Sequence, residues 1–296
     1  MRNIGIKALL VTLSMVMMAA SCHAELSGNA AGRIPERVIS LAPSVSQIIV
    51  DMGMGDRLVA IDTQTPNYVQ GLEGLEQFDM MAPDIERLAA LEADVVFVSG
   101  MSTTYDDPYG MLEQLGVNIV RMPSSGSIEE IKADVMQVAE SLGAESAGQA
   151  LVEEMEREID AIAAIGKGIE TKKRVLFEIS PLPELISFGR ETYLDEMLTL
   201  VGAENVLSDE QGWISLSEEQ AVSINPDVIL TLESNLDDPV GEILARPGWQ
   251  SVNAVVNREV FSIKNPACSL PNHRVAEALL EIAVCLYPDE YEGLTV

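Results

Sequence analysis

The stretch "AESAGQALVEEMEREIDAIAAI", residues 144–165, decides the architecture expected of this chain of 296 residues. It holds no proline and one glycine, and its apolar residues recur at the three- and four-residue spacing of one helix face. These apolar residues are Ala147, Leu151, Met155, Ile159 and Ile162. We expect one long helix of about 30 Å, at 1.5 Å per residue. Because it separates two similar runs of strands and helices, it predicts a stiff bridge that excludes a large hinge closure.

Strand and helix patterns alternate on both sides of this bridge. Buried-strand patterns at 37–42 and 94–100 enclose a helical pattern at 84–93, and further strand patterns follow at 173–180 and 227–234. This alternation favours parallel sheets covered by helices. The predicted organisation is an N-terminal α/β lobe at 33–143, a bridging helix at 144–168 and a C-terminal α/β lobe at 169–296.

The N-terminus has the features of an export signal. Arg2 and Lys7 precede an apolar run at 8–20, which is too short to cross a bilayer. We expect a signal peptide at 1–24, with two possible cleavage sites. Cleavage before Cys22 would leave a lipidated cysteine, whereas cleavage after Ala24 would release a soluble form. The protein is therefore expected to be exported, either to the periplasm or to the outer face of a membrane through lipid at Cys22.

Charge and composition exclude several classes of protein. Removing residues 1–21 leaves 16 Lys and Arg against 47 Asp and Glu, a net charge of −31. Such a chain repels nucleic acid and anionic lipid. A hydrophobic content of 47% also excludes a disordered acidic tail. Cys268 and Cys285 remain available for a disulfide, but Cys285 lies among apolar helix positions that are typical of a buried thiol.

Several segments, in order, resemble one protein family. They include "RVISLAPSVSQIIVDMGMGDRLVAID" (37–62), "DIERLAALEADVVFVSG" (84–100) and "SLPNHRVAEALLEIAVCLYP" (269–288). They look like the substrate-binding proteins of ABC importers for ferric siderophores, cobalamin and haem. The resemblance implies two α/β lobes, one long bridging helix and a ligand cleft between the lobes. It also implies a monomer without enzymatic activity or a resident cofactor, because any metal arrives chelated in the ligand.

The resemblance also implies partner proteins. In this family a glutamate on each lobe docks on arginines of a membrane permease, which works with an ATPase. Glu86 and Glu219 occupy the matching positions. Exposed glutamates on helices are common in so acidic a chain, so this assignment depends on the two residues occupying corresponding places in the two lobes.

Candidate ligand-binding residues lie in the loops at the carboxyl ends of the strands, where open α/β sheets place their sites. Tyr68 stands in one of these loops. The predicted ligand-binding set is Ser44, Met80, Met81, Met101, Tyr105, Arg190, Trp213, His273 and Arg274. These side chains suit a bulky, partly apolar ligand with a few polar groups.

Three metal chelates fit that description. A ferric siderophore often carries negative charge, for which Arg190 and Arg274 would be partners. Cobalamin is large and near neutral, so apolar and aromatic walls would serve it. Haem comes third: Met81 falls where some haem-binding relatives place an axial methionine, and His273 would be a second donor.

Other readings remain as alternatives. Bare zinc or manganese needs three or four converging ligands, and the folded body beyond the N-terminal segment, with His273 as its one histidine, offers few. A chelatase-like enzyme on a related two-lobed plan is the rival class, although no catalytic triad order or phosphate-binding loop occurs. A scaffold lipoprotein that has lost its ligand is a third reading.

The segment 265–274, "NPACSLPNHR", is expected to be a loop in which Asn272 caps the last helix.

Overall fold

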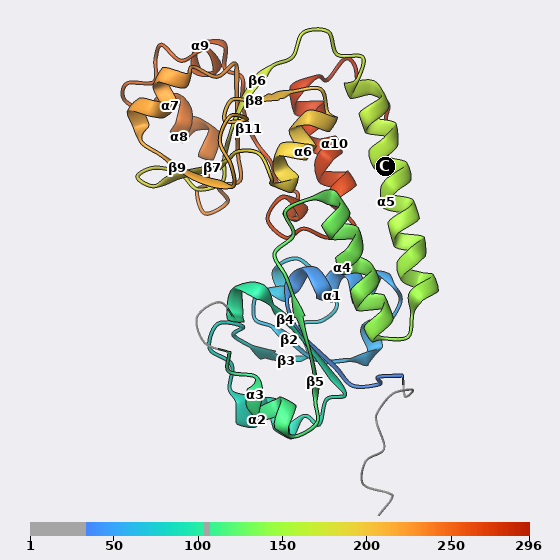
Figure 1. The fold of residues 1–296 in the computed structure, drawn as a ribbon. Coiled ribbons are helices and arrows are strands. Elements are labelled where there is room, and N and C mark those ends of the chain that lie inside the picture. The colour runs from blue at the N-terminus through green and yellow to red at the C-terminus, as the bar shows by residue number, and fades with distance from the viewer. Residues whose placement is uncertain (1–33, 104–106) are drawn as a thin grey trace, which may run out of the picture. The chain divides into compact units, whose positions relative to one another are not determined.

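Two parallel sheets, one in each half of the chain, organise the fold (Figure 1). The computed structural model describes residues 34–103 and 107–296. The predicted signal peptide with Cys22, and also Tyr105, lie outside the described residues. From Pro35 to Val296 the chain forms one compact unit, so contacts between its two lobes are part of a single packed body.

The N-terminal sheet has five strands in the order β3-β2-β1-β4-β5, and every neighbouring pair is parallel. Its strands are β1 (Val38–Leu41), β2 (Leu58–Asp62), β3 (Glu76–Phe78), β4 (Val95–Ser99) and β5 (Asn118–Met122). The central strands β1 and β4 are almost wholly buried, which explains their continuous apolar sequence.

Helices or 3-10 turns follow each of these strands. They are α1 (Pro43–Asp51), η1 (Gly55–Arg57), η2 (Thr65–Asn67), α2 (Ile85–Ala90), η3 (Gly100–Thr103), α3 (Gly110–Gln114) and α4 (Ile128–Ser141). Buried residues of α1 and α4 pack on one core cluster of the sheet, whereas residues of α2 and α3 belong to another. The expectation of a parallel sheet covered by helices is confirmed.

The C-terminal sheet has four strands in the parallel order β11-β10-β6-β8. A separate antiparallel pair, β7–β9, was not predicted from the sequence. The strands are β6 (Arg174–Glu178), β7 (Leu185–Phe188), β8 (Glu204–Asn205), β9 (Trp213–Leu216), β10 (Val228–Thr231) and β11 (Val260–Ser262). The helices are α6 (Tyr193–Leu200), α7 (Glu218–Ile224), α8 (Pro239–Ala245), α9 (Asn253–Asn257), η4 (Pro266–Cys268) and α10 (Val275–Leu286).

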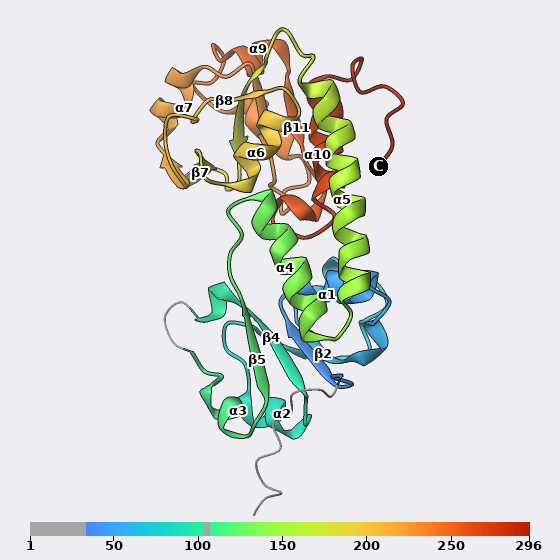
Figure 2. The same ribbon diagram turned by 45° about the vertical axis from the view of Figure 1, so that its right-hand side comes forward.

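Helix α5 (Glu145–Gly166) is the long bridge that the sequence predicts. Its first half contributes Val152 to the core of the N-terminal lobe, and its second half contributes Ile159 and Ile162 to the core of the C-terminal lobe. Helices α4 and α5 lie side by side in both views (Figures 1 and 2). The single glycine of the predicted helix has a packing reason, because a Cβ on Gly148 would lie 2.4 Å from the Cβ of Ala139 in α4.

The start of α4 joins the two lobes as well. The Ser127 hydroxyl accepts the Glu130 N–H at 3.1 Å. The Glu130 carboxylate, however, accepts the N–H of Gly126. The free N–H of Ile128 donates to the carboxylate of Glu196, on α6 of the other lobe, at 2.8 Å. A negative charge at a helix N-terminus is favourable, so Glu196 stabilises both the helix and the junction.

One local prediction before α10 was wrong. The helix begins at Val275, and Arg274 rather than Asn272 is its N-cap, without a capping side chain. The Asn272 side chain accepts the N–H of Arg274 at 2.8 Å, so it forms a turn two residues long instead of capping the helix.

Cys268 and Cys285 are free thiols, and burial raises the pKa of Cys285 to about 11. The interpretation of Cys285 as a thiol is therefore confirmed.

Candidate functional site

A cavity of about 230 Å³ lies between residues of the two lobes. The N-terminal lobe lines it with residues of α1 and the loop after β2, and the C-terminal lobe lines it with residues 265–277. The lining residues are Pro43, Gln47, Tyr68, Asn265, Pro266, Ala267, Leu270, Asn272, Arg274 and Glu277. Polar amides, one cation and one aromatic ring therefore converge on a small space beside apolar loop atoms.

The local backbone fixes several of these side chains. Asn265 accepts the Ala267 N–H at 2.9 Å, and its own N–H donates to Glu281 of α10 at 2.8 Å. Tyr68 follows the 3-10 turn of η2, and its N–H donates to the carbonyl oxygen of Thr65. The Tyr68 ring is 41% exposed, so one wall of the cavity is an aromatic side chain open to solvent.

Next to the cavity, one carboxylate gathers donors from both lobes. Asp51 accepts from Arg274 Nε at 2.7 Å and from Arg274 Nη2 at 2.9 Å, which is a bidentate ion pair. The same carboxylate lies 2.8 Å from His273 Nε2 and accepts from Gln47 Nε2 at 2.9 Å. Asp51 is the last residue of α1, where the helix dipole opposes a negative charge, so the cation of Arg274 offsets that cost.

The environment of Asp51 changes its acidity. Burial alone would raise the pKa of this carboxyl, but hydrogen bonds from His273 and Arg274, and the charge of Arg274, outweigh that effect. The pKa of Asp51 is consequently lowered well below its ordinary value of 3.8. Asp51 thus stays ionised throughout the neutral and mildly acidic range, and this contact between lobes persists there.

His273 occupies the lobe junction and is not among the residues that line the cavity. The side chain is 8% exposed, and within the described residues its Nδ1 atom is buried without a hydrogen-bond partner. Because Nε2 faces the Asp51 carboxylate, a neutral ring carries its hydrogen there and leaves the lone pair on Nδ1. In this arrangement His273 serves the contact with Asp51 and presents no donor to the cavity.

Met80 and Met81 stand on a turn that the sheet holds rigidly. Asp62, buried at the end of β2, accepts the N–H of Gln64 at 2.8 Å and that of Met80 at 3.0 Å. The Tyr109 hydroxyl donates to the Met80 carbonyl at 3.4 Å. Burial raises the pKa of Asp62, and these backbone donors partly oppose the shift. Met81 is 56% exposed, so its thioether is displayed on a fixed turn.

Trp213 and Arg190 belong to the antiparallel region of the C-terminal lobe. Trp213 is the first residue of β9, is 58% exposed and meets the ring of Phe188 edge to face at 6.4 Å. Arg190 donates from Nη2 to the carbonyl of Asp209 at 3.1 Å and from Nε to that of Glu210 at 3.5 Å. The indole is therefore available for stacking, whereas part of the Arg190 guanidinium is occupied by backbone.

Of the predicted ligand-binding residues, Arg274 lines the cavity. Ser44 lies beside the lining residue Pro43 in the first turn of α1, and Met101 lies in the η3 turn. The sequence analysis pointed to Tyr68 as a loop residue, and it placed Asn265 and Asn272 in the right loop without choosing them as ligand contacts. Gln47 and Glu277 were missed, because they lie on helix faces and no loop or motif signal points to them.

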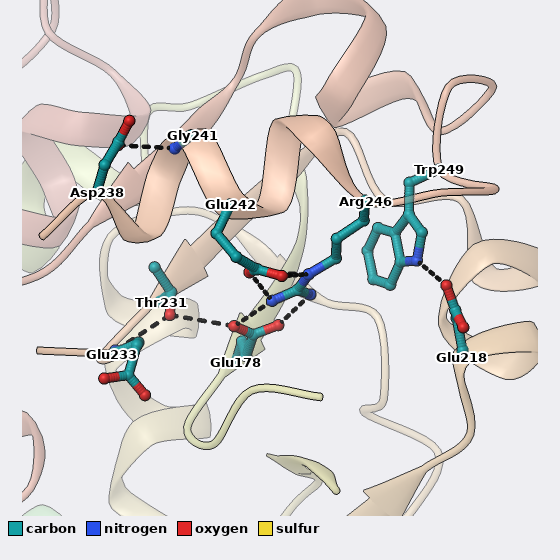
Figure 3. Close-up of polar contacts among 9 residues, drawn as sticks. All are labelled: Glu178, Glu218, Thr231, Glu233, Asp238, Gly241, Glu242, Arg246 and Trp249. Carbon is teal, nitrogen blue, oxygen red and sulfur yellow. Dashed lines mark hydrogen bonds and ion pairs between the residues drawn. The ribbon is translucent and has the colours of Figure 1, made fainter. Parts of the chain in front are cut away.

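The predicted docking residues are both exposed at the starts of short helices. Glu86 lies in the first turn of α2, and Glu219 in the first turn of α7. The neighbouring Glu218 is different, because its carboxylate accepts the indole N–H of the buried Trp249 at 3.0 Å (Figure 3). The two adjacent glutamates of α7 therefore have different surroundings.

Among residues 34–103 and 107–296, no group of three or more His, Cys, Asp or Glu residues is arranged to hold a metal ion. None of the helices in the described part of the chain combines the length and the apolar content that a membrane span requires.

Comparison with known proteins places the chain in a family. Residues 38–267 match the family model described as periplasmic binding protein. An uncharacterized ABC transporter substrate-binding lipoprotein of Bacillus subtilis, YvrC, is 28% identical over 262 residues, which are 87% of this chain and 82% of the relative. A vitamin B12-binding protein of Vibrio parahaemolyticus is 26% identical over 251 residues, which are 83% of this chain and 88% of that protein.

The fold comparison agrees with this. A possible iron-binding, periplasmic solute-binding protein from Staphylococcus epidermidis superposes with a TM-score of 0.77 at 26% identity, covering 86% of this chain and all of the other. These relatives are binding proteins and not enzymes, and the two α/β lobes joined by one long helix are confirmed. The match over most of the chain and the shared fold lead to one conclusion: the chain belongs to the periplasmic binding protein family.

Proposed function

We propose that this protein is the substrate-binding component of an ABC importer and that its ligand is a cobalamin, held between the lobes. The relative from Vibrio parahaemolyticus supports this proposal through its vitamin B12-binding description. The lipoprotein relative from Bacillus subtilis supports the importer role and a lipid anchor at Cys22. The metal would be part of the ligand, so the protein itself needs no resident cofactor.

The observation that favours cobalamin over a ferric siderophore is that both candidate arginines already have hydrogen-bond partners within the protein. Arg274 is bound bidentately by Asp51, and Arg190 donates to two backbone carbonyls. An anionic ferric siderophore would have to compete with these partners and with a mature net charge of −31. A near-neutral cobalamin avoids that competition and uses the exposed rings of Tyr68 and Trp213 instead.

The size of the cavity fits partial burial of such a ligand. About 230 Å³ is below the range of roughly 300–1,000 Å³ that encloses a drug-sized molecule. The cavity therefore accepts one edge or side chain of a corrin, where Gln47, Asn265 and Asn272 offer amide groups to its amide substituents. The macrocycle then contacts the exposed side chains outside the cavity.

Ligand titration tests this proposal. Purified mature protein is titrated with cyanocobalamin, haemin, a ferric hydroxamate and a ferric catecholate, with calorimetry and visible absorbance as readouts. We expect cyanocobalamin to bind tightest, with a Kd below about 10 μM. Tyr68→Ala and Trp213→Ala should each weaken it about ten-fold, since each removes one stacking wall. The matched control is Val256→Ala, an exposed apolar residue on α9 away from the cavity lining. Tighter binding of a ferric siderophore, or no binding of any probe, contradicts the proposal.

Haem is the second candidate, and the exposed Met81 is the observation that favours it. A thioether on a rigid turn is suited to be an axial ligand of a chelated iron. Haemin titration should then give a Soret band that Met81→Ala shifts or removes, while Met80→Ala on the same turn leaves it in place. A Soret band that is identical in both variants excludes axial ligation by Met81.

The partners follow from the importer role. Glu86 and Glu219 would contact arginines of a permease that acts with an ATPase, and the binding protein would act as a monomer. Charge reversal by Glu86→Arg and Glu219→Arg should abolish uptake and leave ligand affinity unchanged, because neither residue lines the cavity. Loss of ligand affinity in this double variant would remove the docking assignment.

A further inference from the structure

The first turn of α7 is tied to the interior of its lobe by one side chain. The indole Nε1 of Trp249 donates to Glu218 Oε1 at 3.0 Å, and Trp249 itself is fully buried (Figure 3). A buried indole N–H needs an acceptor, and Glu218 supplies a charged one. Glu218 is itself exposed on the surface of the helix, but its carboxylate is bound to a buried side chain of the lobe.

Trp249 is fixed from its other side by a cation. The guanidinium carbon of Arg246 lies 5.1 Å from the centre of the Trp249 ring. Arg246 is 3% exposed and donates to both oxygens of Glu178, at 2.6 and 3.0 Å. It also donates to Glu242, one turn earlier, at 2.6 Å. An arginine held by two carboxylates has little rotational freedom, so the ring stacked on it is held in place as well.

These contacts reach the central sheet. Glu178 is the last residue of β6, and the hydroxyl of Thr231, the last residue of β10, donates to it at 3.3 Å. Figure 3 shows hydrogen bonds from Thr231 to Glu178 and from Arg246 to Glu178, and a separate one from Trp249 to Glu218; the ring contact of Arg246 with Trp249 joins the two groups. The first turn of α7 is thus anchored to the carboxyl ends of two parallel strands.

The backbone of α7 adds a second restraint. Ser217 and Gln220 form a reciprocal capping box, with distances of 3.2 and 2.9 Å, that sets the conformation of the first turn. The capping box fixes the helix locally but not its orientation on the lobe. Glu219, the next residue after Glu218, is exposed. The orientation of its carboxylate depends on how the first turn of α7 packs on the lobe.

We propose that Trp249 positions the docking carboxylate of Glu219, with Glu218 as its internal anchor and not as a contact to the permease. This inference rests on the proposed importer function. Of these two adjacent residues, Glu218 holds the helix on the lobe and Glu219 contacts the permease. Arg246 restrains the Trp249 ring, and Trp249 holds Glu218 through its indole N–H. The first turn of α7 therefore keeps one orientation, and with it the exposed carboxylate of Glu219.

The experiment measures binding of the ligand-loaded protein to its permease–ATPase complex in nanodiscs, together with ligand affinity and thermal stability. Trp249→Phe keeps an aromatic ring but removes the indole N–H together with the five-membered ring, so thermal stability is measured beside binding to detect the cost of the smaller buried ring. We expect this variant to weaken permease binding about three- to ten-fold, because the turn that carries Glu219 loses one anchoring contact while the contact to the permease itself is kept, and ligand affinity stays within about two-fold. Glu219→Gln should weaken permease binding more, because it removes the contact itself. Glu204→Gln, an exposed loss of charge on β8 of the same lobe, is the neutral control.

Glu218 variants separate anchoring from docking. Glu218→Gln keeps an amide oxygen that accepts the indole N–H, so permease binding should stay near the wild-type value. Glu218→Ala should match Trp249→Phe, and combining these two changes should add nothing, because both remove the same contact. Glu218→Ala also tests the idea at an exposed site if Trp249→Phe folds poorly.

Several outcomes overturn the inference. Equal losses from Glu218→Gln and Glu219→Gln mean that Glu218 itself contacts the permease. Wild-type permease binding in both Trp249→Phe and Glu218→Ala means that the anchor does not position Glu219. If the wild-type protein does not associate, or Glu219→Gln has no effect, the docking function fails and the inference fails with it, a pattern distinct from the first two.

Discussion

The carboxylate of Asp51 and the guanidinium of Arg274 form a bidentate ion pair between parts of the chain that are 223 residues apart. Asp51 ends α1 in the N-terminal lobe, and Arg274 precedes α10 in the C-terminal lobe. A second contact between the lobes is the hydrogen bond from the Ile128 N–H, at the start of α4, to Glu196. Both contacts join the lobes in addition to the bridging helix α5.

Breaking the pair should lower stability. Asp51→Asn keeps the size of the side chain but loses the charge and one of its two acceptor oxygens, while Arg274 and His273 keep their donors. We expect the free energy of unfolding to fall by about 1–3 kcal/mol, as measured by urea denaturation, since hydrogen bonds to a charged group are lost. Glu277→Gln is the control, because Glu277 lies 3.8 Å from Arg274 Nη1 at an exposed position. Equal stability of Asp51→Asn and wild type would show that the pair contributes nothing.

The same pair predicts a dependence on acid. Because the folded-state pKa of Asp51 is lowered from 3.8, the unfolded chain binds more protons there as the solution is acidified. The contribution of Asp51 is therefore complete above the ordinary carboxyl pKa and is lost as the pH falls toward the folded-state pKa. The stability difference between wild type and Asp51→Asn should be constant down to about pH 5 and then shrink toward pH 2. Urea denaturation across that range measures it, and a difference that grows on acidification contradicts the lowered pKa.

The ion pair of Arg246 and Glu178 should behave as a buried pair. Both side chains are at most 2% exposed. Arg246→Met leaves the Glu178 carboxylate buried without its cation, so we expect a loss of about 3–5 kcal/mol in the free energy of unfolding. Adding Glu178→Leu removes that unpaired charge and should recover part of the loss. Glu242, whose side chain is 40% exposed, provides the control Glu242→Gln, with an effect below about 1 kcal/mol. A double variant less stable than Arg246→Met alone would contradict this explanation.

The crossing of α4 and α5 should be sensitive to one methyl group. Gly148→Ala puts a Cβ 2.4 Å from that of Ala139, which the packed helices cannot accept without moving. We expect thermal unfolding to show a loss of about 1–3 kcal/mol. Ala139→Gly in the same chain removes the opposing methyl and should restore part of the stability, apart from the helix cost of the new glycine. If the Ala139→Gly change brings no recovery, the close contact at this crossing is not the cause.

Neighbouring residues explain most of what could be predicted. The spacing of apolar residues located α5, and the continuous apolar runs located β1 and β4. Ser127 caps α4 by accepting the N–H of Glu130, since a cap depends on residues only three positions apart. Asn272 has an equally good capping sequence but accepts the backbone N–H of Arg274, a residue whose guanidinium binds Asp51 of the other lobe. The β7–β9 pair escaped prediction because its partners are not adjacent strands in the chain.

In the candidate site, too, local sequence patterns located some residues and missed those that depend on tertiary packing. The loops that supply Tyr68, Asn265 and Asn272 could be named from strand ends, whereas Gln47 and Glu277 could not. The sequence by itself determined two parallel sheets, a bridging helix and the family resemblance, because periodicity and turn chemistry act over a few residues. Only the tertiary structure decided that Asp51 holds His273 and Arg274, and that Trp249 binds Glu218 and not Glu219. Such choices depend on which side chains packing brings within hydrogen-bond distance, and that distance in space is unrelated to distance along the chain.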